Sequence, residues 1–268
     1  MDFTVDGRNA YAYTANHAPD ASLPSIVFVH GAGLDHSWWA LQSRYFGYHK
    51  RNVLALDLPG HARSEGPPLA SVEAIADWIV RLLDAAKLDQ AAMVGHSMGS
   101  LAVLECAARH AARVTHIALL GTGYPMKVSD SFLGAAKGNQ QSAYDMETIW
   151  GHAPQVPLAG NPNPGMWMYG DTLARLARLA PGVLHNDLKA CNDYAGGMDA
   201  AAKTTCPALF ILGRRDMMTP PKAASALARA VAGARTVTCE PSGHSLMAES
   251  PDAVLDALIE FLQPKRKP

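Results

Sequence analysis

The stretch Gly95-His96-Ser97-Met98-Gly99 decides the fold. It matches the pattern G-x-S-x-G and lies between an apolar run at 92–95 and a helical run at 101–110. A sharp strand-to-helix turn of this kind lifts the serine hydroxyl above a sheet and brings backbone N–H donors beside it. Glycines on both sides leave room for a strained backbone. The stretch therefore predicts Ser97 as a nucleophile at the carboxyl end of a strand.

Around this turn, short apolar runs alternate with longer segments of helical period. That alternation is typical of an α/β fold, in which helices flank a mostly parallel central sheet. Near-continuous apolar runs indicate strands buried on both faces, and we expect them at residues 26–30, 53–57, 92–95, 116–120, 208–213 and 236–239. A more polar strand pair around 3–14 is expected at the edge of the sheet.

Hydroxyl side chains mark the starts of three predicted helices. Ser71 is placed to cap a helix whose apolar face runs through 72–83. Thr219-Pro220 and Ser250-Pro251 each pair an N-cap hydroxyl with a proline in the first turn. The last helix carries apolar residues at core spacing up to Leu262, and the tail 264–268, three basic residues between prolines, should form a solvated end.

From residue 123 to 202 the alternation stops, and the chain becomes rich in Met, Trp, Gly, Pro and Asn. A long interruption inside a compact α/β domain is usually functional. We therefore expect a helical cap, or lid, at 123–202, inserted into a core domain formed by residues 1–122 and 203–268.

Composition narrows the classes of function. With 49% hydrophobic and 18% charged residues among 268, the chain can bury a full core. Its 23 Lys+Arg against 24 Asp+Glu give no general field for binding nucleic acid or anionic lipid. No run approaches the ~18 apolar residues of a membrane-spanning helix, and the N-terminus lacks the apolar core of a secretory signal. We expect a cytoplasmic protein with no nucleic-acid or membrane partner.

The cysteines give no sign of a metal or disulfide site. They show no C-x-x-C pair and no nearby histidine at metal-ligand spacing. We expect no metal and no cofactor, and we interpret the four cysteines as reduced, buried, small apolar residues: Cys106, Cys191, Cys206 and Cys239.

A serine hydroxyl needs a base to become a good nucleophile. Of the eleven histidines, His244 is best placed, because it lies in a turn after the predicted strand 236–239. That turn reaches the same end of the sheet as Ser97 if both strands are parallel. His30 and His96 belong to turns that they should shape, and four further histidines are interpreted as structural: His110, His116, His152 and His185.

The base needs a carboxylate to orient it. Asp216 follows the predicted strand 208–213, and the chain order Ser97, Asp216, His244 is that of an α/β-hydrolase triad. Asp57 also ends a strand but precedes the nucleophile, so we interpret it as shaping a loop.

Backbone donors could hold the oxygen that becomes negative during attack. The N–H of Met98 follows the nucleophile directly. A second donor should come from the bend His30-Gly31-Ala32-Gly33. We favour Ala32, and the residues leave Ala32 and Gly33 both open.

Taken together, the chain resembles the α/β-hydrolase superfamily over nearly its whole length, in particular its small lidded esterases and enol-lactone hydrolases. Ala62 departs from the pattern, since the family usually has Gly there. The resemblance implies a two-step mechanism through an acyl-enzyme, and Ser at position 97 disfavours the members with an Asp nucleophile. The motifs that carry it are His30-Gly31, 57–64, Gly95-His96-Ser97-Met98-Gly99, Gly213-x-x-Asp216 and Gly243-His244.

Tryptophans and methionines cluster near the turns and in the cap. Each could pack in the core, but as a group they favour an apolar, adaptable substrate pocket. Arg214 and Arg215 could bind a substrate carboxylate or pair with surface acids. The predicted pocket residues are Trp38, Trp39, Met126, Trp150, Trp167, Met217 and Met247, with Met166, Met168 and Met218 in the same clusters.

The sequence thus predicts a carboxylesterase for small or medium apolar acyl groups, acting on a small-molecule ester. An enol-lactone, C–C bond or thioester hydrolase would use the same triad. A ligand-binding protein that has lost its chemistry is disfavoured, because all three triad residues are present.

Overall fold

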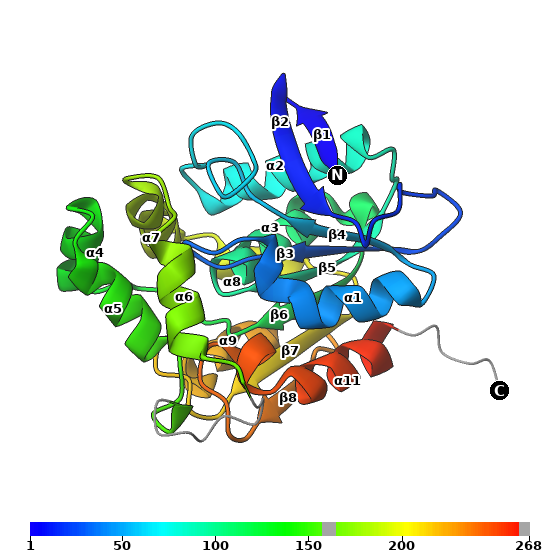
Figure 1. Ribbon diagram of the computed structural model, residues 1–268. Helices are drawn as coiled ribbons and strands as arrows, with labels where there is room; N and C mark the ends of the chain where they lie inside the picture. Colours follow the sequence, from blue (N-terminus) through cyan, green and yellow to red (C-terminus); the bar gives the residue numbers. More distant parts are fainter. Residues whose placement is uncertain (157–164, 263–268) are drawn as a thin grey trace.

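A computed structural model describes residues 1–156 and 165–262 of the chain. Within these ranges, eight strands form one sheet in the order β1-β2-β4-β3-β5-β6-β7-β8 (Figure 1). The β1–β2 and β2–β4 pairs are antiparallel, and all the other pairs are parallel. The strands are β1 (Asp2–Val5), β2 (Arg8–Tyr13), β3 (Ser25–Val29), β4 (Asn52–Leu56), β5 (Ala91–His96), β6 (Val114–Leu120), β7 (Ala208–Gly213) and β8 (Arg235–Cys239).

The predicted strands are present, with ends that differ by at most two residues. Strands β3, β4, β5 and β7 are buried throughout because helices cover both faces of the central sheet. The expectation of two buried faces is wrong for β8, where only Cys239 is fully buried. This strand has a neighbour on one side only, so its side chains meet solvent.

Two helical layers cover the sheet. One apolar cluster packs α2, α3, α8 and α9 against it, and a second cluster packs α1 and α11 on the other face (Figure 1). The helices of the two layers are η1 (His36–Trp39), α1 (Ala40–Tyr48), α2 (Val72–Ala85), α3 (Met98–Arg109), η2 (Ala111–Arg113), α8 (Gly197–Lys203), α9 (Pro221–Ala230), α10 (Leu246–Glu249) and α11 (Pro251–Leu262).

The helix start signals have mixed outcomes. Ser71 caps α2 as predicted, since its hydroxyl accepts a hydrogen bond from the N–H of Ala74. Ser250 stands directly before α11, and its hydroxyl accepts from Ser242. The N-cap role predicted for Thr219 is wrong. Helix α9 begins at Pro221, and the Thr219 hydroxyl donates to Asp216 instead.

Between β6 and β7 the chain forms further helices that extend beyond the sheet (Figure 1). Each of them contacts another member of the group. They are α4 (Asp130–Lys137), α5 (Gln141–Trp150), α6 (Met168–Leu176) and α7 (Val183–Asp193).

Two smaller expectations concern the cysteines and the chain's end. The four cysteines are free, and Cys206 is half-buried, not buried as expected. The tail 264–268 lies outside the described residues. Over the described ranges, no helix combines the length and the hydropathy needed to cross a bilayer.

Candidate active site

Ser97 occupies the turn between β5 and α3. Its φ of 51° and ψ of −116° place it in a backbone conformation that is strained for a residue with a side chain. The flanking glycines permit the turn: a Cβ at Gly95 would lie 2.2 Å from the carbonyl oxygen of Gly99, and a Cβ at Gly99 would lie 2.4 Å from that of Val29. Ser97 precedes α3 without capping it through its side chain. Its hydroxyl is therefore free for other chemistry.

Asp216 and His244 lie in the turns that follow β7 and β8. Asp216 Oδ2 is 2.7 Å from His244 Nδ1, and both side chains are buried. The N–H groups of Met218 and Thr219 donate to Asp216 Oδ1, and the Thr219 hydroxyl donates to Oδ2. The carboxylate is thus held in one orientation toward the imidazole.

The protonation of this pair follows from its surroundings. Burial disfavours the imidazolium of His244, but the charge and hydrogen bond of Asp216 outweigh it and raise the pKa of His244 above its usual value. Burial opposes ionisation of Asp216 as well, yet His244 and the Thr219 donors lower the pKa of that carboxyl. With Nδ1–H donated to Asp216, the lone pair of neutral His244 is on Nε2. No described residue forms a hydrogen bond with that nitrogen.

His96 connects the turn of Ser97 to the turn of His244. Its Nε2–H donates to the carbonyl oxygen of His244 at 2.9 Å, and the two ring centroids are 4.7 Å apart. Burial lowers the pKa of His96 well below the usual value, and the charge of His244 lowers it further. His30 is also buried, with its pKa lowered to about 4. Both are neutral near pH 7, consistent with the predicted shaping role.

Asp187 of α7 distinguishes the two candidate backbone donors in the bend after β3, because it binds one of them. Its Oδ2 accepts from the N–H of Gly33 at 2.9 Å and lies 2.8 Å from His61 Nε2. The Gly33 N–H is therefore already used. Of the two candidate donors in this bend, the contact favours the N–H of Ala32, and Met98 has an N–H at the first position of α3.

A cavity of about 360 Å³ opens above Ser97. Its walls come mainly from α4, α5 and α7 and from the loops after β6 and β7. The lining residues are Ala32, Ser97, Met126, Lys127, Val128, Ser129, Phe132, Glu147, Trp150, Leu188, Cys191, Met217, Met218 and Thr219.

Three of the predicted pocket residues, Met126, Trp150 and Met217, line this cavity, and so does Met218. Others lie elsewhere, because a buried aromatic or thioether fits a core as well as a pocket. Trp38, Trp39 and Met247 pack in the core cluster that contains α1 and α11, and Met168 is buried beside Val156. Trp167 is 77% exposed and Met166 is 38% exposed.

Arg214 and Arg215 are not among the residues that line this cavity. Arg214 is 3.8 Å from Glu240 in an exposed ion pair, and Arg215 donates to the side-chain oxygen of Gln155. The alternative in which they pair with surface acids agrees with the contact of Arg214, whereas Arg215 contacts an amide.

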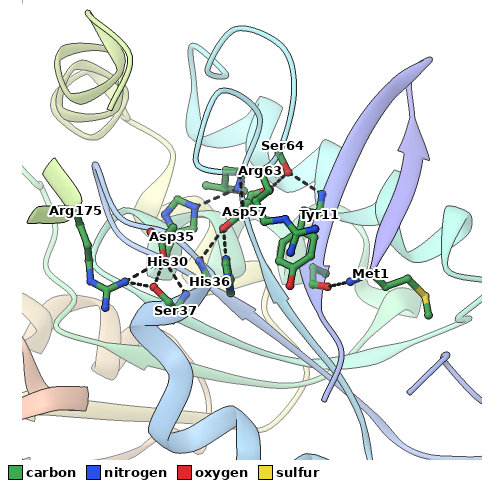
Figure 2. Close-up of polar contacts among 12 residues, drawn as sticks. Met1, Tyr11, His30, Asp35, His36, Ser37, Asp57, Arg63, Ser64 and Arg175 are labelled. Atoms are coloured by element: carbon green, nitrogen blue, oxygen red, sulfur yellow. Dashed lines mark hydrogen bonds and ion pairs between the residues drawn. The ribbon is translucent and has the colours of Figure 1, made fainter. Parts of the chain in front are cut away.

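Asp57 joins two loops, as interpreted from the sequence (Figure 2). Its carboxylate accepts from the N–H groups of His36 and Arg63, and its Oδ1 is 2.7 Å from His36 Nδ1. Together with Asp35, these side chains bring three possible metal-ligand atoms within 4.8 Å of one another. Asp35 accepts from Ser37 and Arg175, so protein donors already engage the group.

Two acids at the site were not predicted from the sequence. Glu147 of α5 lines the cavity, and Asp187 of α7 binds Gly33. Neither lies in a motif. A signal exists for Glu147, since it shares helical spacing with Ala143 and Trp150 and so falls on the inward face of its helix.

A strained serine on a strand-to-helix turn, above a mostly parallel sheet with helices on both faces, defines an α/β-fold hydrolase. The sequence model of the Alpha/beta hydrolase family matches residues 26–257, and the chain belongs to this family. The resemblance seen in the motifs is thereby confirmed.

Known relatives cover most of the chain. It is 28% identical to a pimeloyl-[acyl-carrier protein] methyl ester esterase of Neisseria meningitidis, over 91% of this chain and 95% of that one. It is 23% identical to the (E)-2-((N-methylformamido)methylene)succinate hydrolase of Acinetobacter baylyi, over 93% and 94%. Among solved structures, the enol-lactonase of Burkholderia xenovorans superposes with a TM-score of 0.84 at 24% identity, over 98% and 99%. An esterase of Exiguobacterium antarcticum gives 0.84 at 18%, over 97% and 98%.

Proposed function

We propose that this protein is a serine hydrolase that cleaves carboxylic esters of small or medium apolar acyl groups through an acyl-enzyme. One observation carries the proposal. Ser97, on its strained turn, lines an apolar cavity, and a buried Asp216–His244 pair lies at the same end of the sheet. These are the nucleophile, base and orienting acid that acyl transfer requires.

The reaction would begin with attack of Ser97 Oγ on the acyl carbon, while its proton passes to His244 Nε2. The carbonyl oxygen becomes an oxyanion held by the N–H groups of Ala32 and Met98. When the C–O bond to the alcohol breaks, His244 returns the proton to the leaving oxygen, and the acyl group remains on Ser97 as an ester.

Water would release the acyl group in the second step. As the water oxygen attacks the acyl carbon, His244 Nε2 accepts a water proton. The bond to Ser97 Oγ then breaks, the carboxylic acid leaves, and the proton returns to Ser97. Asp216 stabilises the imidazolium in both steps.

The lid is part of the proposal. We assign residues 123–202 to a cap and residues 1–122 and 203–268 to the hydrolase core. In support, α4, α5 and α7 contribute the cavity side chains Phe132, Glu147 and Leu188, so the cap would enclose the substrate. Helix α8, at the end of this segment, differs from the other cap helices because it packs against α3 and α9 in the layer that covers the sheet.

The apolar walls favour an uncharged acyl chain, because burying an unpaired charge among them would be unfavourable. The relative named as a methyl ester esterase supports ester cleavage. Lactone hydrolysis is a second candidate, since the same attack opens a cyclic ester and the chain shares its fold with an enol-lactonase.

A substrate series tests this proposal. Purified protein would be assayed on p-nitrophenyl esters of graded acyl length, beside a lactone and a thioester. We expect the highest kcat/KM on a short or medium ester. A lactone turned over faster than every ester would favour the second candidate, and no turnover of any substrate would refute both.

A further inference from the structure

Glu147 is a buried acid in a cavity that is otherwise mainly apolar. Only 8% of its surface is exposed, and it lines the same cavity as Ser97. It projects from α5, on the face that also carries Trp150. A carboxyl in such a place is unfavourable unless a hydrogen-bond donor meets it.

The described residues provide no such donor to its Oε2. The other buried acids near the site have donors for at least one oxygen: Glu249 Oε2 accepts from the N–H groups of Gly243 and Ala153, although no described residue donates to its Oε1, and Asp187 accepts from Gly33. Among the described residues, Glu147 is thus the acid that lines the cavity and whose buried Oε2 has no hydrogen-bond donor.

Apart from Ser97, whose hydroxyl the proposed reaction uses, the polar side chains that share the cavity form hydrogen bonds with other groups. Lys127 Nζ donates to the carbonyl oxygen of Asn192, the Ser129 hydroxyl accepts from the N–H of Phe132, and the Thr219 hydroxyl donates to Asp216. A bound molecule in the cavity could supply the donor that Glu147 lacks.

Electrostatics agrees with this placement. Burial raises the pKa of Glu147 to about 7, while the charge of His244 opposes the rise. The same interaction raises the pKa of His244. The carboxyl thus lies within electrostatic reach of the proposed base, where a bound substrate would also lie.

We propose that Glu147 is a specificity-determining residue that accepts a hydrogen bond from an N–H or O–H group on the substrate's chain and rejects substrates carrying a carboxylate there. This inference rests on the proposed function and narrows its substrates to apolar esters that bear one donor group, such as an acylamino group. Two carboxyl groups facing each other in the cavity would repel or force one to bind a proton.

Matched esters test this directly. One p-nitrophenyl ester carries a terminal acetamido N–H, the second has that nitrogen methylated, and the third ends in a carboxylate, each over several spacer lengths. For the best spacer, wild-type kcat/KM should favour the N–H ester over its N-methyl analogue by ~10- to 100-fold, the range of a hydrogen bond to a charged group.

Three variants separate recognition from folding. Glu147→Leu should bring that ratio close to one. Glu147→Gln keeps the shape and an acceptor oxygen, so it should retain part of the preference and improve turnover of the carboxylate ester. Asp145→Asn, an exposed acid on the same helix, should leave the ratios unchanged. An equal ratio in wild type and Glu147→Leu would overturn the inference.

Binding to a Ser97→Ala protein keeps this test separate from the reaction. Calorimetry on that protein should give tighter binding of the N–H ester than of the N-methyl ester, and Glu147→Leu in the same background should abolish the difference. If wild type cleaves no ester while the binding preference is present, the proposed function fails and the recognition role stands. If esters are cleaved but the binding preference is absent, the proposed function stands and the recognition role of Glu147 fails.

Discussion

At the scale of single residues, the protonation state of His244 controls the proposed reaction. A general base must be neutral to accept a proton. Because Asp216 raises the pKa of His244, the neutral form predominates only at a higher pH than for an unperturbed histidine, whose pKa is about 6.5. We predict that kcat/KM rises with pH with a midpoint above that value. A profile that is flat between pH 5 and 8 would contradict the assignment.

The orienting acid gives a second prediction. Asp216→Asn should lower kcat on the order of 10⁴-fold, because the amide would no longer hold His244 in the required tautomer or stabilise its charge. Asp57→Asn is the matched control, since Asp57 also follows a strand of the sheet, β4, but contacts His36 and Arg63. Steady-state kinetics of both folded variants distinguishes whether Asp216 or Asp57 orients His244. A large loss in Asp57→Asn with none in Asp216→Asn would mean that the acid is wrongly assigned.

Ala62 carries a strain that can be measured. Its φ is +40°, where a side chain costs about 1–2 kcal/mol and glycine costs little. Glycine also loses more backbone entropy on folding, about 0.5–1 kcal/mol. Ala62→Gly should therefore raise the free energy of unfolding by roughly 0.5–1 kcal/mol, measured by chemical denaturation. Ala228→Gly, within α9, should lower it by about 1 kcal/mol. Equal losses in both variants would show that no strain is present at Ala62.

At the scale of elements, one side chain joins α7 to two turns of the core. Asp187 binds His61 and the N–H of Gly33, next to the proposed oxyanion donor Ala32. Asp187→Ala should lower the free energy of unfolding by about 3 kcal/mol, since it leaves a buried histidine and a buried N–H without a partner. It should also lower kcat more than it raises KM, because the donor loop loses its anchor.

The control for this prediction is Asp193→Asn on the same helix. Asp193 is exposed and pairs only with neighbours on α7, Lys189 and Asn192. Its variant should leave both the denaturation midpoint and kcat unchanged. If Asp187→Ala behaves like this control, α7 is not coupled to the core through Asp187.

At the scale of the whole molecule, the sequence predicts the framework better than the pocket. Strand positions follow from buried apolar runs, and the candidate triad residues follow from turns at strand ends, because backbone geometry there demands particular residues such as Gly95 and Gly99. The register of the sheet then brings distant turns to one end. These are local signals that a single chain displays.

The cavity depends instead on how helices pack over the sheet. The sequence predicts both Trp39 and Trp150 as pocket residues, yet Trp39 packs in the core and Trp150 lines the cavity. Glu147 and Asp187 are single acids on helices, and their partners or lack of partners arise only from tertiary packing. Composition cannot distinguish these outcomes because it carries no information on which helix faces which loop.

Covalent labelling of Ser97 tests the central claim most directly. The protein would be treated with a p-nitrophenyl alkylphosphonate, and its peptides would be mapped by mass spectrometry. We predict a single phosphonyl adduct, located on Ser97, with complete loss of esterase activity. In parallel, Ser97→Ala should take up no label and lose on the order of 10⁴- to 10⁶-fold in kcat. An adduct on another residue, or a Ser97→Ala protein that keeps a tenth of the wild-type rate, would contradict the account.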